Sequence, residues 1–495
     1  MYLNQSIPLL FATPSVASSR RAIVSSLFLL GFAILSYFAT EIFESLPFFM
    51  LMTLLIGIHG YVCLTTTASN LLFIFRYFLV WILVFGTAFV WFLYDGEVFV
   101  APFGLISQTP ENTRLLVLAG MFSLCGSLVG WHIALLRFKF QKYPEFSIPN
   151  KYRNRLINVG LYLAIGFVLL YIWKVGGFVG GSKSYADGQE GFELTFGVFN
   201  IFQLIGIALL LLSSMRSNRI YIRYLLVSIF TLVLGMLAGS RADYLPQAFI
   251  VILLLYNHNI TNILLKRQYV KLIKWVLLLI CLLFIGYLVA TYIAIWRGGL
   301  SFLQVMDIIL ANNNGLLISN VYGHKMLYFE TGNMMLGGFY SAIVQVHEGI
   351  TGFLLGESYL NYFLIAPPAL LNLPRPLGLE WATEINDVTM TQGGIFEVAE
   401  AYWNFGLLGC FFVSLFISYC FGWLLQRGLK ANNYFYLVWY MVYGLHGFRS
   451  VWYQNFSYFR LMTVMLFVYL VALFLFKWFV TDRKTTIRLG GQLDV

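Results

Sequence analysis

The sequence predicts an all-α, polytopic membrane protein: a bundle of about twelve transmembrane helices with one large loop on the outer side of the membrane. Of its 495 residues, 60% are hydrophobic and 11% are charged, and the mean hydropathy is +0.79. Soluble proteins carry about 25% charged residues, so the bilayer must solvate this chain. No polar stretch is long enough for a separate soluble domain, and residues 1–495 are interpreted as a single integral membrane domain.

Twelve apolar runs are long enough to cross a bilayer. They lie at residues 22–42, 46–66, 71–94, 115–136, 155–173, 194–214, 222–240, 244–258, 272–296, 398–424, 433–448 and 461–480. The first run follows Arg20 and Arg21, and no small-residue cleavage site follows it cleanly. We therefore interpret it as an uncleaved first helix and not as a signal peptide.

The distribution of charge supports this count of spans. With the N-terminus inside, the cytoplasmic segments hold 22 of the 31 basic residues, Arg76 among them, and three of the 21 acidic residues. This asymmetry follows the positive-inside rule, and one missed span would invert it further along the chain. Both termini are therefore expected in the cytoplasm. The net charge of +10 reflects topology, so no nucleic-acid partner is expected.

Residues 297–396 form the large outer loop, which is apolar for much of its length. Its apolar pieces, Leu300–Leu310, Met334–Val346 and Gly352–Leu371, are too short to span and are interpreted as interfacial or re-entrant helices. The dipeptide Pro367-Pro368 is expected to break the last of them. Such a loop could serve as a lid over a lipid-linked substrate. The alternative is that it packs on the helix bundle and takes no part in catalysis.

Arg241 lies in a turn between two runs that together leave no room for an aqueous loop. An arginine submerged there costs at least about 2.5–3.5 kcal/mol unless it is paired or hydrated. It either pairs with Asp243 to close the hairpin or binds an anionic lipid headgroup.

Four further arginines face the same side against the general charge pattern: Arg297, Arg375, Arg449 and Arg460. Guanidinium groups bind phosphate oxygens bidentately, so the set indicates an anion site suited to a diphosphate leaving group. For any single one, snorkelling at a helix end is the alternative.

Candidate general bases are Glu397 and Glu400, three residues apart at the mouth of the tenth span, and His324 and His347 in the loop. A lone histidine is more often a packed, hydrogen-bonded residue. The five cysteines lie in apolar runs without CxxC spacing, and no acidic cluster matches a metal site. Neither a metal nor another cofactor is expected.

The segment from Gln392 to Gly409 contains Glu400, Asn404-Phe405-Gly406 and Gly409. It resembles the E-x-x-x-NFG-x-x-G signature of Wzy-type oligosaccharide repeat-unit polymerases. The segments Gly356-Glu357-Ser358-Tyr359, Leu373-Pro374-Arg375-Pro376 and Gly239-Ser240-Arg241 are similar to parts of the same family. The motifs cover about 40 residues, while the resemblance in layout covers the chain.

The resemblance implies a glycosyltransferase of the GT-C type in a bacterial inner membrane. It would transfer a growing glycan from its undecaprenyl diphosphate onto the next lipid-linked repeat unit to build O-antigen, capsule or exopolysaccharide. The implied site residues are Arg241, Glu400 and Asn404, and the implied partners are lipid-linked oligosaccharide, membrane lipids and a chain-length regulator.

Three other readings remain open at this point. An O-antigen ligase has the same architecture and would use a loop histidine such as His324 or His347. A lipid-linked oligosaccharide flippase also suits twelve spans, although transporters usually show two related halves. A non-enzymatic scaffold is the third.

Overall fold

The computed structural model describes most of the predicted bundle. The described residues are 15–38, 46–67, 70–93, 97–100, 104–107, 110–136, 150–175, 193–214, 222–237, 318–321, 324–327, 352–370, 396–430, 433–453 and 458–471, with the single positions 244, 247, 248, 250, 251, 274, 303 and 346.

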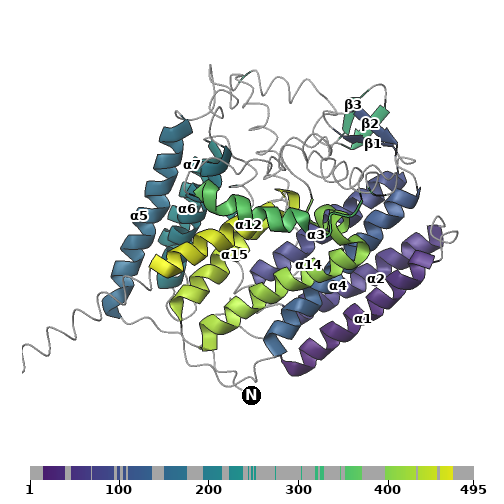
Figure 1. The fold of residues 1–495 in the computed structure, drawn as a ribbon, viewed down its shortest axis with the longest axis horizontal. Helices are drawn as coiled ribbons and strands as arrows, with labels where there is room; N and C mark the ends of the chain where they lie inside the picture. Colours follow the sequence, from purple (N-terminus) through teal and green to yellow (C-terminus); the bar gives the residue numbers. More distant parts are fainter. Residues whose placement is uncertain are drawn as a thin grey trace, which may run out of the picture.

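The described part is helical apart from two short hairpins (Figure 1). The helices are α1 Val16–Phe38, α2 Leu46–Thr67, α3 Leu71–Leu93, α4 Pro110–Leu136, α5 Asn150–Val175, α6 Glu193–Ser214, α7 Ile222–Leu237, α12 Glu357–Leu370, α14 Glu397–Lys430, α15 Tyr434–Tyr453 and an unlabelled helix, Tyr458–Val471. The antiparallel strand pairs are β1 Glu97–Val100 with β2 Gly104–Ser107, and β3 Ile318–Val321 with β4 His324–Leu327.

Ten of the twelve predicted apolar runs coincide with described helices. Within the described residues, five helices are long and apolar enough to cross a membrane: Val16–Phe38, Met50–Thr67, Arg114–Leu136, Arg153–Trp173 and Glu397–Lys430. The protein is therefore a helical membrane protein. The runs 244–258 and 272–296 lie mostly outside the described residues, so the total of twelve stays a prediction.

The centre of the bundle is the contact between α4 and α14, which run in the same direction. Gly126 lies against the carbonyl of Phe411, and Gly130 lies against the carbonyl of Leu415 one turn further along both helices. Ser123 and Ser414 hydroxyls are hydrogen-bonded at 2.7 Å across the same contact. Small residues allow helix backbones to approach closely where lipid removes the usual hydrophobic driving force.

Helices α3 and α15 pack on this central pair and run in the opposite direction to it. On α3, Val84 meets Gly120 of α4, and the Phe73 ring stacks on Trp131 with centroids 4.6 Å apart, so the two helices are antiparallel. On α15, Tyr443 donates to the carbonyl of Ile417 at 3.1 Å and Leu437 lies against Gly428, so α14 and α15 are antiparallel. Antiparallel packing of α3 with α4 and of α14 with α15 is the pattern of consecutive membrane spans joined by short connections.

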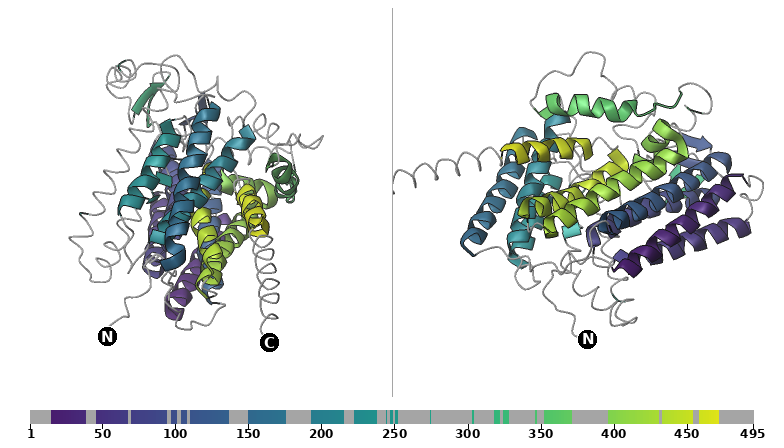
Figure 2. Two further views of the ribbon diagram at one scale, coloured as in Figure 1. Left: turned by 90° about the vertical axis from the view of Figure 1, so that its left-hand side faces the viewer. Right: turned by 60° about the horizontal axis from the view of Figure 1, so that its bottom comes forward.

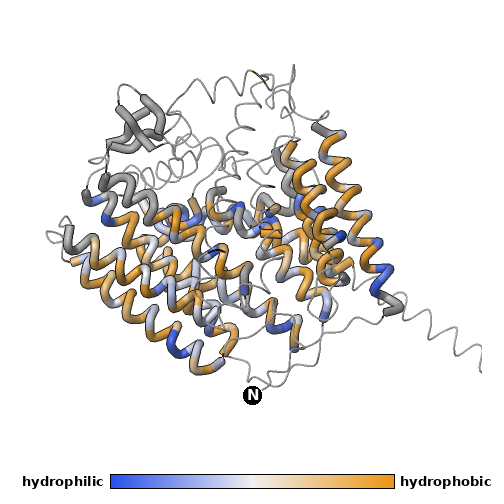
Figure 3. Tube along the Cα trace, turned by 180° about the vertical axis from the view of Figure 1, so that it is seen from behind, coloured by the Kyte–Doolittle hydropathy of each residue, from blue (hydrophilic) through white to orange (hydrophobic). Residues whose placement is uncertain are grey.

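The outward faces of the peripheral helices are apolar. Phe28 and Leu35 of α1 and Tyr162 and Trp173 of α5 are each two-thirds exposed or more. Figure 3 shows apolar colour along most of α5, with hydrophilic residues gathered at the end where it begins. Such a distribution places the middle of the helix in lipid and its charged end in the interface.

Two predictions about residues 297–396 need correction. The dipeptide Pro367-Pro368 does not break its helix, because α12 continues through both prolines to Leu370. Strands β3 and β4 form a hairpin between two of the predicted helical pieces, in a segment for which no strand was predicted. The described part of α12 lies outside the group of long helices, beside the start of α14 (Figures 1 and 2).

Replacing Gly126 by alanine tests the close contact between α4 and α14. A Cβ there would lie 2.1 Å from the Phe411 carbonyl oxygen, so the backbones must separate. We expect Gly126→Ala to destabilise the protein by about 1–3 kcal/mol, as overpacked cores do. The control is Gly57→Ala on α2, where nothing lies within 4 Å of the new methyl group. The midpoints of thermal unfolding in detergent compare the stability of the two variants. Equal midpoints would contradict a close contact between the backbones of α4 and α14.

Candidate functional site

The helix that carries the family-like signature is not straight. At Phe405 (φ −142°, ψ 15°) and Gly406 (φ 66°, ψ −155°) the backbone leaves the helical region and divides α14 into a short segment, 397–404, and a long segment, 407–430. The Cys410 thiol donates to the carbonyl of Val398 at 3.5 Å. Twelve residues of straight helix would put about 18 Å between these positions, so the short segment folds back along the long one.

The structure explains why glycine occupies positions 406 and 409 of the signature. Gly406 adopts the positive φ that glycine tolerates and that side chains with a Cβ rarely adopt. At Gly409 a Cβ would lie 2.3 Å from the carbonyl oxygen of Ala401, so only glycine permits the two segments to pack this closely. The signature therefore encodes a helical hairpin, and every residue from 397 to 404 is buried within it.

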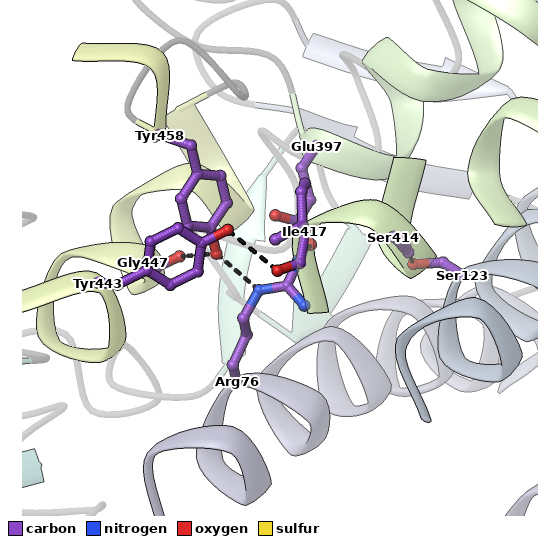
Figure 4. Close-up of polar contacts among 8 residues, drawn as sticks. All are labelled: Arg76, Ser123, Glu397, Ser414, Ile417, Tyr443, Gly447 and Tyr458. Carbon is purple, nitrogen blue, oxygen red and sulfur yellow. Dashed lines mark hydrogen bonds and ion pairs between the residues drawn. The ribbon is translucent and has the colours of Figure 1, made fainter. Parts of the chain in front are cut away.

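The fold-back changes the location of Glu397. The sequence placed Glu397 at the mouth of a span and placed Arg76 with the cytoplasmic charges. In the structure both are buried inside the bundle, and Arg76 Nη2 donates to Glu397 Oε1 at 2.6 Å (Figure 4). Arg76 Nε donates to the hydroxyl of Tyr458 at 2.7 Å, and this hydroxyl donates to the carbonyl of Gly447 at 3.3 Å.

The buried carboxylate of Glu400 lies one turn further along the short segment. Its Oε1 accepts hydrogen bonds from the hydroxyls of Ser358 at 3.1 Å and Tyr362 at 2.6 Å, both on α12. Burial, followed by the neighbouring Glu400 carboxylate, raises the pKa of Tyr362 well above its ordinary value. Tyr362 therefore remains a hydrogen-bond donor at physiological pH.

Asn404 fastens the start of α12 to the end of the short segment. Its side-chain oxygen accepts from the backbone N–H of Gly356 at 3.0 Å, and its amide nitrogen donates to Ser358 Oγ at 2.8 Å and to the Glu400 carbonyl at 2.9 Å. The N–H groups of Leu354 and Leu355 donate to the carbonyls of Trp403 and Asn404. These bonds satisfy groups that the broken helix would otherwise leave unpaired.

Aromatic rings cover the other side of this junction. Tyr359 stacks on Phe405 and on Phe459, with ring centroids 6.2 and 6.1 Å apart. Phe459 also contacts Tyr362 and Phe363. Since Phe459 follows Tyr458 directly, one stretch of chain contacts both the Arg76–Glu397 pair and the residues around Glu400.

The structure brings together three of the predicted site residues: Glu397, Glu400 and Asn404. Arg460 is buried two positions after Tyr458, and Arg449 is half-buried on α15. His324 is the first residue of β4, and nothing is described of its side chain. The predicted residues Arg241, Arg297, Arg375 and His347 lie outside the described part.

Arg76, Tyr458 and Tyr362 were missed from the sequence. A signal for Arg76 existed, because it lies five residues inside an apolar run, where an ionisable group indicates function or pairing. Tyrosine is too common in this chain, with 31 residues, for any one to be recognised. Within the described ranges, no three His, Cys, Asp or Glu side chains are grouped as a metal site would require.

The arrangement supplies a buried carboxylate that accepts hydrogen bonds from two hydroxyl groups. A carboxylate that accepts hydrogen bonds from hydroxyl groups can orient a substrate hydroxyl in the same way. It can then accept the proton of that hydroxyl as a general base. The chain matches no protein-family model, no curated protein and no solved structure.

Removing the Asn404 side chain should release α12 from the hairpin. Asn404→Ala leaves the Gly356 N–H and the Ser358 hydroxyl without this partner, which costs about 1–3 kcal/mol. We expect faster backbone hydrogen exchange in α12 and unchanged exchange in α4. The control is Asn200→Ala, which breaks the buried amide pair of Asn200 with Gln247 on another helix. Equal exchange of α12 in both variants would contradict the role of Asn404.

Proposed function

We propose that this chain is a polytopic glycosyltransferase that polymerises undecaprenyl-diphosphate-linked oligosaccharide repeat units on the outer face of a bacterial inner membrane. One observation carries the proposal. The two segments with the clearest family resemblance, Gly356–Tyr359 and Glu400–Gly409, hydrogen-bond to each other around one buried carboxylate. About forty residues of sequence separate the two segments. If each resembled the family by chance, there would be no reason for the two segments to be in contact in the fold.

The geometry favours Glu400 over Glu397 as the general base. Glu397 is held by Arg76 at 2.6 Å, so its Oε1 atom already belongs to a buried ion pair. The carboxylate of Glu400 accepts hydrogen bonds from the hydroxyls of Ser358 and Tyr362. An acceptor sugar hydroxyl would donate to this carboxylate in the same way. The sequence left this choice open.

The proposed reaction is a substitution at the anomeric carbon of the lipid-linked donor. The acceptor hydroxyl loses its proton to the Glu400 carboxylate as its oxygen bonds to the anomeric carbon. The bond from that carbon to the phosphate oxygen breaks, and undecaprenyl diphosphate leaves with the electron pair. Guanidinium groups are suited to neutralise the departing diphosphate, and the proposal assigns this role to Arg241, with Arg297, Arg375, Arg449 and Arg460 as supporting cations.

Replacing Glu400 tests the base directly. We expect Glu400→Gln to lower the polymerisation rate by about 10²–10⁴-fold, the usual contribution of a general base, with normal amounts of protein in the membrane. The matched control is Glu357→Gln, which removes the exposed carboxylate beside the same junction. Glycan ladders from cells that express each variant give the readout, and full-length polymer from Glu400→Gln would refute the assignment.

Cells that lack the gene distinguish the proposed polymerase from its rivals. We expect surface lipid or lipid carrier to bear single repeat units in place of a ladder, because flipping and ligation continue. Long polymer that accumulates on the lipid carrier would instead identify a ligase. Absence of repeat units from the outer side would identify a flippase.

A further inference from the structure

Arg76 belongs to none of the segments that resemble the polymerase family, yet it contacts the first residue of the short segment of α14. We propose that Arg76 is a positioning residue: its ion pair with Glu397 fixes the short segment and thereby the carboxylate of Glu400. The anchoring follows from contacts alone. Only its consequence for turnover rests on the proposed function.

Burial makes this ion pair a strong constraint on the chain. The side chains of Arg76 and Glu397 are 6% and 3% exposed, so neither charge can be hydrated if the other moves away. Loss of one partner from a buried pair leaves an uncompensated charge, whereas loss of both charges is often tolerated. Glu397 can therefore leave its position only together with Arg76 or at a large cost in free energy.

The short segment is held at both ends by different parts of the chain. At its far end, the N–H groups of Leu354 and Leu355 and the Asn404 side chain fasten it to the start of α12. At its near end, Arg76 of α3 holds Glu397, which lies about 4.5 Å along the helix axis from Glu400. Without Arg76 the end that carries both carboxylates would lose its ion pair and keep only weaker contacts, such as those of Cys410 with Val398 and of Tyr362 with Glu400.

The guanidinium geometry is specific to arginine. One Arg76 nitrogen donates to Glu397 and another to Tyr458, whose hydroxyl donates in turn to Gly447 of α15 (Figure 4). The fork thus links α3, the short segment, α15 and the helix Tyr458–Val471. A lysine would keep the charge but would not reproduce two donors at a fixed angle.

Hydrogen exchange of the purified protein in detergent tests the anchor without reference to activity. We expect Arg76→Met to speed exchange of amides in residues 397–404 by about a hundredfold or more. The double variant Arg76→Met, Glu397→Gln should restore slow exchange because it removes both charges. The control is Arg114→Met on α4, a buried arginine whose nearest carboxylate, Glu111, is 66% exposed. Unchanged exchange in Arg76→Met would overturn the anchor.

Turnover of native lipid-linked repeat units, extracted from cells that lack the gene, tests the positioning role. We expect Arg76→Lys to lower kcat by about tenfold to a hundredfold with KM unchanged, since a small displacement of a catalytic group has this effect. The neutral double variant lacks the guanidinium as well, so its kcat should stay low even though its slow exchange returns. The positioning role would be overturned if Arg76→Met showed fast exchange while kcat was unaltered in both Arg76→Met and Arg76→Lys. Absence of turnover by the wild type, with the exchange results as expected, would reject the proposed function and leave the anchor standing.

Discussion

The reversal of the chain at Phe405 and Gly406 is the constraint on which the described site depends. An unbroken helix would carry Glu397 and Glu400 to the end of the bundle, away from Arg76. Because Gly406 accepts a positive φ and Gly409 has no side chain, the short segment packs against the long one and places both carboxylates inside the protein. The contacts of Arg76, Ser358 and Tyr362 with these carboxylates all follow from that reversal.

Two acidic residues one turn apart acquire different roles through their partners. Glu397 faces a guanidinium, which holds it in place through a buried ion pair. Glu400 faces two hydroxyls, which orient it and leave it able to exchange hydrogen-bond partners. Their positions along the helix do not distinguish the two glutamates. Their surroundings separate a proposed anchor from a proposed base.

Several polar side chains inside the bundle are paired across helices. Serine pairs, an amide pair and an arginine–glutamate pair link helices that are otherwise apolar. Inside a membrane an unpaired polar group has no water as a substitute partner, so such pairs specify which helices are neighbours. The close contact of α4 with α14 adds shape to this specificity through Gly126 and Gly130.

The sequence by itself determined the helical membrane class and most helix positions. Hydropathy is a local property of the sequence, and an apolar run of sufficient length partitions into the bilayer whatever its tertiary contacts. It also identified Glu397, Glu400 and Asn404 as candidates. Only the tertiary structure decided where they lie: hydropathy runs continuously through Phe405 and Gly406, so the fold-back left no trace in composition, and Arg76 read as an ordinary cytoplasmic charge. The partnership of Arg76 with Glu397, 321 residues apart, exists only once α3 and α14 pack together.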